Sequence, residues 1–298
     1  MADSRSKLQV LPCLDSQELA ERRRRDLELR PELAESLGRS AVAAIELGYY
    51  LTDHGKVDWS RMVANARDSK ISIPPEAELP TASDPRESAD AIVTRVQVTN
   101  ETTLGAAKRL VGAGLRPLAL NFANGFETGG GFLRGATAQE EALCRSSALY
   151  ATLLDDPMYG FHRENRHLKA SSWAILSPDV PVFRDDAGME MDQPWLLSFI
   201  TCAAPYAPEL GQPLSSQLLR ERIHRVMSIA QSYDYRTLVL GAWGCGAFGN
   251  DTTGTAEDFR EALERDFVGV FSDVVFAITD WSEERRFLGP FRSVFPAS

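Results

Sequence analysis

The sequence predicts an α/β fold built on a mostly parallel sheet. From about residue 92, apolar runs of strand length alternate with helical patterns, which is typical of layered α/β folds. The runs are apolar throughout, which indicates a sheet covered on both faces. Two of the runs lead into glycine-rich loops, and ligands of such sheets bind at the carboxyl ends of the strands.

The chain divides into an extension and a main domain. Residues 1–90 predict helices followed by a linker, and residues 91–298 carry the alternating pattern. The stretch 69–91 is rich in Pro, Ser, Asp and Glu, which is typical of a surface linker or a wrapping segment. The extension is short and charged, so we expect it to pack on the main domain.

Two helices are expected in the extension. Asp15 or Ser16 can cap the first, and the second is expected over about 32–47, with Gly48 as its C-cap. His54 is expected in a turn between short extended pieces. The basic run Arg22–Arg25 predicts a solvated helix face, with contact to substrate phosphates as the alternative.

The main domain is expected to alternate strands and helices. The strands are predicted at Ile92–Thr99, Leu118–Ala123, Trp173–Ser177, Leu196–Ala203, Leu238–Trp243 and Val274–Thr279. The helices are predicted at about 102–113, 138–154, 216–231 and 256–270.

The stretch from Leu118 to Leu154 carries the clearest chemical pattern. A glycine triplet follows the apolar run, and an acidic pair stands at the head of the next helix. The residues are Gly129, Gly130 and Gly131, then Gln139, Glu140 and Glu141. Glycine suits a loop whose amides approach a ligand, and such amides can form an anion-binding concavity. The two glutamates flank the apolar stripe of the helix, so we expect them to rim a cleft.

A second glycine-rich loop, Gly244–Asn250, follows the strand predicted at Leu238–Trp243. It matches the G-x-G-x-x-G pattern of dinucleotide-binding proteins. We reject that reading because the loop comes late, no acid lies about 20 residues further on, and residues 250–254 are expected to separate it from its helix. A diphosphate-binding loop remains chemically sensible, with Phe248 stacking on a ribose or adenine or lying in the core.

These motifs resemble poly(ADP-ribose) glycohydrolases, and the flanking LNFA, RGATAQEE and LGAWGCGAFGN resemble the microbial type. The resemblance covers roughly residues 90–298. It implies a macrodomain-like fold, with a mixed, mostly parallel sheet flanked by helices. One departure is visible: Glu127-Thr128 stands where the microbial type has Asn-Pro.

The resemblance also implies roles. Glu141 would be the catalytic acid/base, Glu140 would orient a ribose, and Asn121 would hold the distal ribose. Gln139 would orient the loop or the ribose, and Gly129, Gly130 and Gly131 would bind the diphosphate. In the second loop the ligand-binding residues would be Gly244, Gly246, Ala247, Phe248 and Asn250. Ala247 stands where related enzymes have a bulkier aliphatic residue, which leaves room for internal units of the polymer.

The implied reaction is hydrolysis of ribose–ribose bonds in poly(ADP-ribose), with ADP-ribosylated proteins as partners and no cofactor. A positioned carboxyl can protonate the leaving oxygen and then activate water. The helix N-terminus favours ionised carboxylates, whereas burial and the neighbouring charge favour a bound proton. A reader of ADP-ribose without catalysis, and a hydrolase of another ADP-ribosyl linkage, remain alternatives.

Composition narrows the remaining possibilities. The net charge of −10 argues against direct DNA binding, which needs many cations to neutralise phosphates. The N-terminus lacks a signal-peptide core and no apolar run reaches membrane-helix length, so a cytoplasmic protein is expected. The four cysteines are widely spaced, which predicts neither a zinc site nor disulfides; Cys202 and Cys245 are expected to be buried.

The histidines show no metal spacing, and His162 and His167 are expected to face solvent. Tyr159, in the same stretch, is expected to border the cleft. Residues 177–184 resemble the family's extended loop after its third strand, which would shape the wall of the site.

Overall fold

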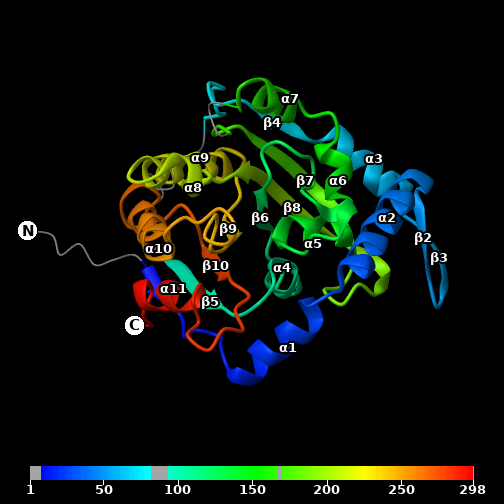
Figure 1. The fold of residues 1–298 in the computed structure, drawn as a ribbon, viewed down its shortest axis with the longest axis horizontal. Helices are drawn as coiled ribbons and strands as arrows, with labels where there is room; N and C mark the ends of the chain where they lie inside the picture. The colour runs from blue at the N-terminus through cyan, green and yellow to red at the C-terminus, as the bar shows by residue number, and fades with distance from the viewer. Residues whose placement is uncertain (1–7, 82–92, 167–169, 298) are drawn as a thin grey trace, which may run out of the picture. The chain divides into compact units, whose positions relative to one another are not determined.

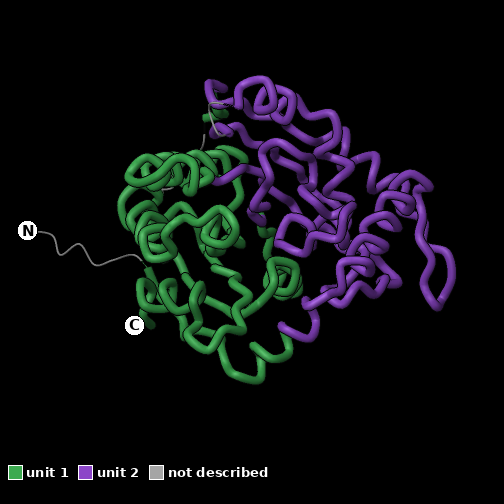
Figure 2. The backbone as a smooth tube through the Cα atoms, viewed as in Figure 1, with its two compact units in different colours: residues 1–23, 78–118, 205–298 green, residues 24–77, 119–204 purple. Residues whose placement is uncertain are grey.

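The computed structural model describes residues 8–81, 93–166 and 170–297 (Figure 1). Most of the expected linker, 82–91, and His167 therefore lie outside the described residues. The chain forms two compact units (Figure 2). Unit 1 comprises residues 1–23, 78–118 and 205–298, and unit 2 comprises residues 24–77 and 119–204. These units do not follow the expected boundary at residue 90, because each includes part of the extension.

Unit 1 contains parallel strands in the order β1-β5-β10-β9. Their bounds are Leu8–Val10 for β1, Thr94–Thr99 for β5, Thr237–Leu240 for β9 and Asp273–Ala277 for β10. Every residue of β9 and β10 is buried, as the apolar runs that begin at Leu238 and Val274 predict. The first strand comes from the extension, which the helical expectation for residues 1–90 did not include.

Several helices belong to unit 1. They are α4 (Thr103–Gly112), α8 (Ala207–Leu210), α9 (Leu214–Ser232), α10 (Thr252–Glu261), the π-helix η4 (Ala262–Asp266) and α11 (Leu288–Val294). The helix α10 packs against α9 and α11. The helix expected over 256–270 thus begins earlier, because Asp251 caps α10 by accepting the Gly254 amide.

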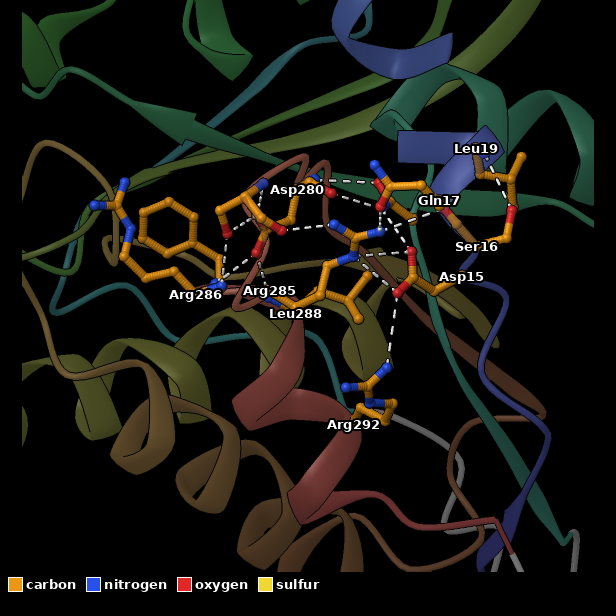
Figure 3. Close-up of polar contacts among 12 residues, drawn as sticks. Asp15, Ser16, Gln17, Leu19, Asp280, Arg285, Arg286, Leu288 and Arg292 are labelled. Atoms are coloured by element: carbon orange, nitrogen blue, oxygen red, sulfur yellow. Dashed lines mark hydrogen bonds and ion pairs between the residues drawn. The ribbon is translucent and has the colours of Figure 1, made fainter. Parts of the chain in front are cut away.

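A polar network ties the N-terminal segment of unit 1 to its C-terminal segment (Figure 3). The guanidinium of Arg285 donates to Asp15 Oδ2 at 3.0 Å. Asn100, which follows β5, donates to Asp15 Oδ1 at 2.9 Å and to the Asp280 carbonyl at 2.7 Å. Ser16, the residue after Asp15, caps helix α1 (Gln17–Leu27) by accepting the Leu19 amide, as predicted. The N-terminal segment of unit 1 is thus held to its C-terminal segment by polar contacts.

Unit 2 contains the strand order β6-β8-β7-β4. The bounds are Ile71–Ile73 for β4, Pro117–Ala123 for β6, Ala174–Arg184 for β7 and Glu190–Ala203 for β8. The strand β7 is antiparallel to both β4 and β8, so the chain has a mixed arrangement of strands. A separate hairpin joins β2 (Tyr49–Thr52) to β3 (Gly55–Asp58), and the exposed His54 lies in its turn as expected.

The helices of unit 2 surround these strands. They are α2 (Pro31–Leu47), α3 (Ser60–Asp68), α5 (Gln139–Ser146), α6 (Leu149–Leu153), α7 (Pro157–Glu164) and the 3₁₀ turn η2 (Phe132–Arg134). Gly48 ends α2 at φ 73°, which confirms the predicted C-cap.

Two expectations for unit 2 are wrong. The helix expected over 138–154 breaks at Ser147. The Ser147 hydroxyl donates a hydrogen bond to the Leu143 carbonyl. The Ser147 backbone is extended and forms a β-bridge with Val182 of β7. Residues 177–184 are not a loop but most of β7. A bulge between Ser177 and Val180 accommodates Pro178 without ending the strand.

Candidate active site

The turn after β6 is shaped by one asparagine and one ion pair. Asn124 Oδ1 accepts the amides of Phe126 and Glu127, at 2.9 and 3.1 Å. The Glu127 carbonyl then accepts the Gly130 amide, and its carboxylate pairs with both terminal nitrogens of Arg134. Glu127, where the microbial type has Asn, thus helps close the glycine turn.

Gln139 joins the start of α5 to the middle of β6. Its Nε2 donates to the Leu120 carbonyl at 2.8 Å, and its Oε1 accepts the Phe122 amide at 2.9 Å. The side chain therefore pairs with β6 as a neighbouring strand would. This geometry fixes where the two following glutamates lie, and it directs both polar atoms of Gln139 to backbone.

Glu140 is buried, with 3% of its surface exposed. Its Oε1 accepts Asn121 Nδ2 at 3.2 Å, and its Oε2 accepts the Asn124 amide at 2.7 Å. Asn121 also donates to Thr201 Oγ1 at 3.2 Å, from β8. Asn121 therefore links Glu140 of α5 to Thr201 of β8.

Glu141 is 8% exposed, and the glycine turn closes on it. Its Oε1 accepts the Gly131 amide at 2.9 Å. A Cβ added at Gly130 would collide with the same oxygen, and Gly130 has a φ of 61°. Its Oε2 accepts no hydrogen bond from the described chain, yet it is not among the fully buried atoms. One oxygen of Glu141 is therefore held, and the other is open to a reactant.

Burial raises the pKa of Glu140 to about 8, against the hydrogen bonds from Asn124 and Asn121, and the charge of Glu141 adds to the rise. Two solvated first-turn glutamates would show no such environment. Glu140 therefore keeps its proton near neutral pH.

The glycine triplet has a use in shaping the turn that the sequence did not predict. The amides of Gly130 and Gly131 are already bonded, to Glu127 and Glu141, so they are not directed at a ligand. The Gly129 amide has no partner among residues the structure describes. Within the triplet, Gly130 lets the backbone approach the carboxyl groups of Glu140 and Glu141, which a larger side chain would displace.

His162 was expected to face solvent, and this is wrong. It lies in α7 with no exposed surface, between Gly125 and Ser171. The charged neighbours in the sequence misled the prediction, because one face of α7 turns inward. Tyr159 is also buried, and its hydroxyl has no hydrogen-bond partner in the described part of the chain.

The second loop lies in unit 1 and follows β9. Gly244 and Gly249 have positive φ values of 76° and 65°. Asn250 is buried and donates to the carbonyls of Pro205 and Gly244, at 2.8 and 3.1 Å. These contacts fold the loop back on itself. The amides of Gly246, Ala247 and Phe248 have no partner within residues 8–81, 93–166 and 170–297, so they can meet an anion.

Phe248 is half-buried rather than a core residue, and its ring meets Tyr206 edge-on at 5.7 Å. Ala247 is exposed. The gap expected before the next helix is shorter than predicted, because α10 begins at Thr252. Cys202 and Cys245 are buried, as expected.

Sequence reasoning missed three residues of the site in unit 2. Asn124 supplies an amide to Glu140, Thr201 supports Asn121, and Gly125 packs against His162. The Asn-Gly pair directly after a strand is a turn signal that could have drawn attention to the first and third. Nothing local distinguishes Thr201 from any other strand threonine.

Comparisons with known proteins identify the family of this chain. A family model described as "Microbial-type PARG, catalytic domain" matches residues 38–185. A poly(ADP-ribose) glycohydrolase structure from Thermomonospora curvata is 39% identical, with a TM-score of 0.82, and the match covers 89% of this chain and 100% of that one. The same enzyme bound to the inhibitor ADP-HPD gives 39% identity and a TM-score of 0.79 over the same shares.

A Deinococcus radiodurans poly(ADP-ribose) glycohydrolase in complex with ADP-ribose is 40% identical, with a TM-score of 0.70. That match covers 78% of this chain and 97% of the other. A comparison with curated protein sequences returned no match. Across the described residues, the structure has no helix with the length and apolar character needed to cross a bilayer.

The predicted class, a macrodomain-like α/β fold with a mixed sheet, is confirmed by these structural matches. The buried acid pair at the glycine turn and the identity of 39% over most of the chain lead to one conclusion. This chain belongs to the microbial-type poly(ADP-ribose) glycohydrolase family.

Proposed function

We propose that the protein hydrolyses the ribose–ribose O-glycosidic bonds of poly(ADP-ribose) and releases ADP-ribose. The observation that carries this proposal is the asymmetry of the acid pair. Both oxygens of Glu140 accept hydrogen bonds, whereas Glu141 has one held oxygen and one open oxygen. An acid/base catalyst needs a fixed carboxyl with one oxygen accessible to the reacting atoms.

In the proposed reaction Glu141 donates a proton to the ribose oxygen that leaves. The C–O bond to the anomeric carbon breaks, and an oxocarbenium-like state forms. The Glu141 carboxylate then takes a proton from water, whose oxygen bonds to the anomeric carbon. ADP-ribose departs, and Glu141 is protonated again, which closes the cycle.

Glu140 has a supporting role in this proposal. It accepts a hydrogen bond from a ribose hydroxyl, and it keeps its own proton at neutral pH because burial raises its pKa to about 8. Asn121, whose Oδ1 is buried without a partner in the described residues, is proposed to act on the distal ribose. The second loop is proposed to bind phosphate through the amides of Gly246 and Ala247, with Phe248 against the adenosine.

The test compares wild-type protein with the Glu141→Gln variant. Both are incubated with purified poly(ADP-ribose) and with ADP-ribosylated protein, and free ADP-ribose is quantified by chromatography. Wild type should release ADP-ribose from the polymer, and the variant should lose at least about 100-fold in rate. Calorimetry with ADP-ribose should show binding by both proteins, because the substitution keeps the shape of the side chain.

Other outcomes point elsewhere. Tight ADP-ribose binding without release by wild type would identify a reader rather than a hydrolase. Release from modified protein but not from polymer would identify another ADP-ribosyl linkage as the substrate. Full activity in Glu141→Gln would remove Glu141 as the acid/base.

A further inference from the structure

The segment between β6 and the glycine turn is held from α7 by a buried histidine. His162 Nδ1 lies 2.8 Å from the Gly125 carbonyl oxygen. On the other side of the ring, the Ser171 amide donates to Nε2 at 3.1 Å. His162 is fully buried, so these contacts are shielded from water. The imidazole therefore joins two separate loops of unit 2.

The Gly125 carbonyl oxygen can only accept a hydrogen bond, so Nδ1 carries a hydrogen and donates it there. On the other side, Nε2 lies 2.8 Å from the Ser171 hydroxyl oxygen and 3.1 Å from the Ser171 amide nitrogen. Each ring nitrogen therefore has a partner, and the ring orientation is fixed from both sides.

The surroundings are built closely around this contact. A Cβ added at Gly125 would lie 2.9 Å from Ala170 Cβ, 3.0 Å from Ala203 Cβ and 3.2 Å from His162 Nδ1. Ala170 has a φ of 66°, a strained value for a residue other than glycine, and it directly precedes the amide that binds His162. Such strain persists where the surrounding structure determines it, and it is concentrated at functional sites.

The other end of the same segment contacts the acid pair. The Asn124 amide donates to Glu140 Oε2 at 2.7 Å, and Asn124 is the residue next to Gly125. The Asn124 side chain continues the turn by accepting two amides. A displacement of Gly125 would therefore move the donor that fixes Glu140.

We propose that His162 is a positioning residue for Glu140, acting through the Gly125 carbonyl and the Asn124 amide. The inference rests on the proposed function, since Glu140 matters there as the partner of the catalytic acid. His162 does not itself touch substrate in this proposal. It determines where one carboxyl of the pair stands.

The test uses substitutions that keep one ring nitrogen each. Asparagine places its amide near the Nδ1 position, so His162→Asn can still donate to Gly125. Glutamine reaches the Nε2 position, so His162→Gln keeps only the Ser171 side. Gly125→Ala disturbs the same hydrogen bond from the other side, because the added methyl group crowds His162 and moves the residue 125 carbonyl. We expect His162→Gln and Gly125→Ala to lower kcat about 10- to 100-fold, with KM changed less, and His162→Asn to retain most of kcat.

A matched control separates positioning from stability. Thr152→Val removes a buried hydrogen bond to Ser177 in the same unit, away from the acid pair. It should lower Tm by an amount similar to the His162 variants and leave kcat unchanged. All rates are measured well below the lowest Tm of the set.

A second readout does not depend on activity. The amide proton of Asn124, hydrogen-bonded to the Glu140 carboxyl group at 2.7 Å, should resonate downfield in the wild-type NMR spectrum. It should move upfield in His162→Gln and Gly125→Ala, and stay in place in His162→Asn and Thr152→Val.

If wild type does not release ADP-ribose, the proposed function fails, and the Asn124 resonance still decides the role of His162. An unchanged resonance in His162→Gln would overturn the inference. Unchanged kcat in both His162→Gln and Gly125→Ala would overturn it as well.

Discussion

Replacing Glu140 by glutamine should change how the stability of the protein depends on pH. Burial raises the pKa of Glu140 from 4.5 to about 8 in the folded protein. Between these values the folded state binds one proton more than the unfolded state. Unfolding then releases a proton, so the free energy of unfolding falls as pH rises, by about 1.4 kcal/mol per pH unit.

The expected magnitude follows directly. From pH 5 to pH 8, wild type should lose about 4 kcal/mol of stability through this one group. The contribution is fully present below pH 4.5 and is lost as pH rises through about 8. The Glu140→Gln variant cannot ionise at this position, so its stability should lack this slope.

The local contacts allow the substitution. In the Glu140→Gln variant, the new side-chain oxygen can still accept the Asn124 amide. Asn121 Oδ1 has no partner in the described residues, so a 180° flip of that amide brings an acceptor to the new Nε2 donor and to the Thr201 hydroxyl. Any cost of this rearrangement lowers the free energy of unfolding of the variant by the same amount at every pH. The test of the Glu140 pKa is therefore the slope of that free energy with pH.

The measurement is urea unfolding of wild type and Glu140→Gln at half-unit steps from pH 5 to pH 9. The difference between the two free energies should change in favour of the variant by about 4 kcal/mol across the range. Parallel curves would show that Glu140 is ionised throughout, and the argument from burial would be refuted.

Three further substitutions and one control test the framework of the site. Gly130→Ala should destabilise the protein by about 2 kcal/mol and abolish ADP-ribose release, because a Cβ there displaces a buried carboxylate; Gly112→Ala, at an open helical position, should leave both unchanged within about 1 kcal/mol. Gln139→Ala should cost about 2–3 kcal/mol in urea unfolding, since it leaves two backbone groups of β6 unpaired. Arg184→Met should lower the unfolding free energy by about 3 kcal/mol, because this buried guanidinium joins α2, α5 and β8; a change below about 0.5 kcal/mol would contradict its structural role.

Local patterns were sufficient for much of the fold. The strand runs, the caps Ser16 and Gly48, and the two glycine loops after strands were predicted from neighbours in the sequence. These features depend on backbone propensities and on periodicity over a few residues. The helix break at Ser147 escaped the same reasoning, because it depends on a partner in β7 that is distant in the chain.

The sequence by itself determined which residues form the acid pair, since Glu140 and Glu141 stand at a fixed offset from the glycine triplet. Only the tertiary structure decided how the two differ. Glu140 is buried and accepts a hydrogen bond at each oxygen, whereas Glu141 keeps one oxygen accessible to a reactant. The tertiary structure also decided that His162 is buried. The physical reason is that residue identity and spacing are covalent properties, whereas burial, hydrogen-bond partners and pKa are set by segments that meet only when the chain folds.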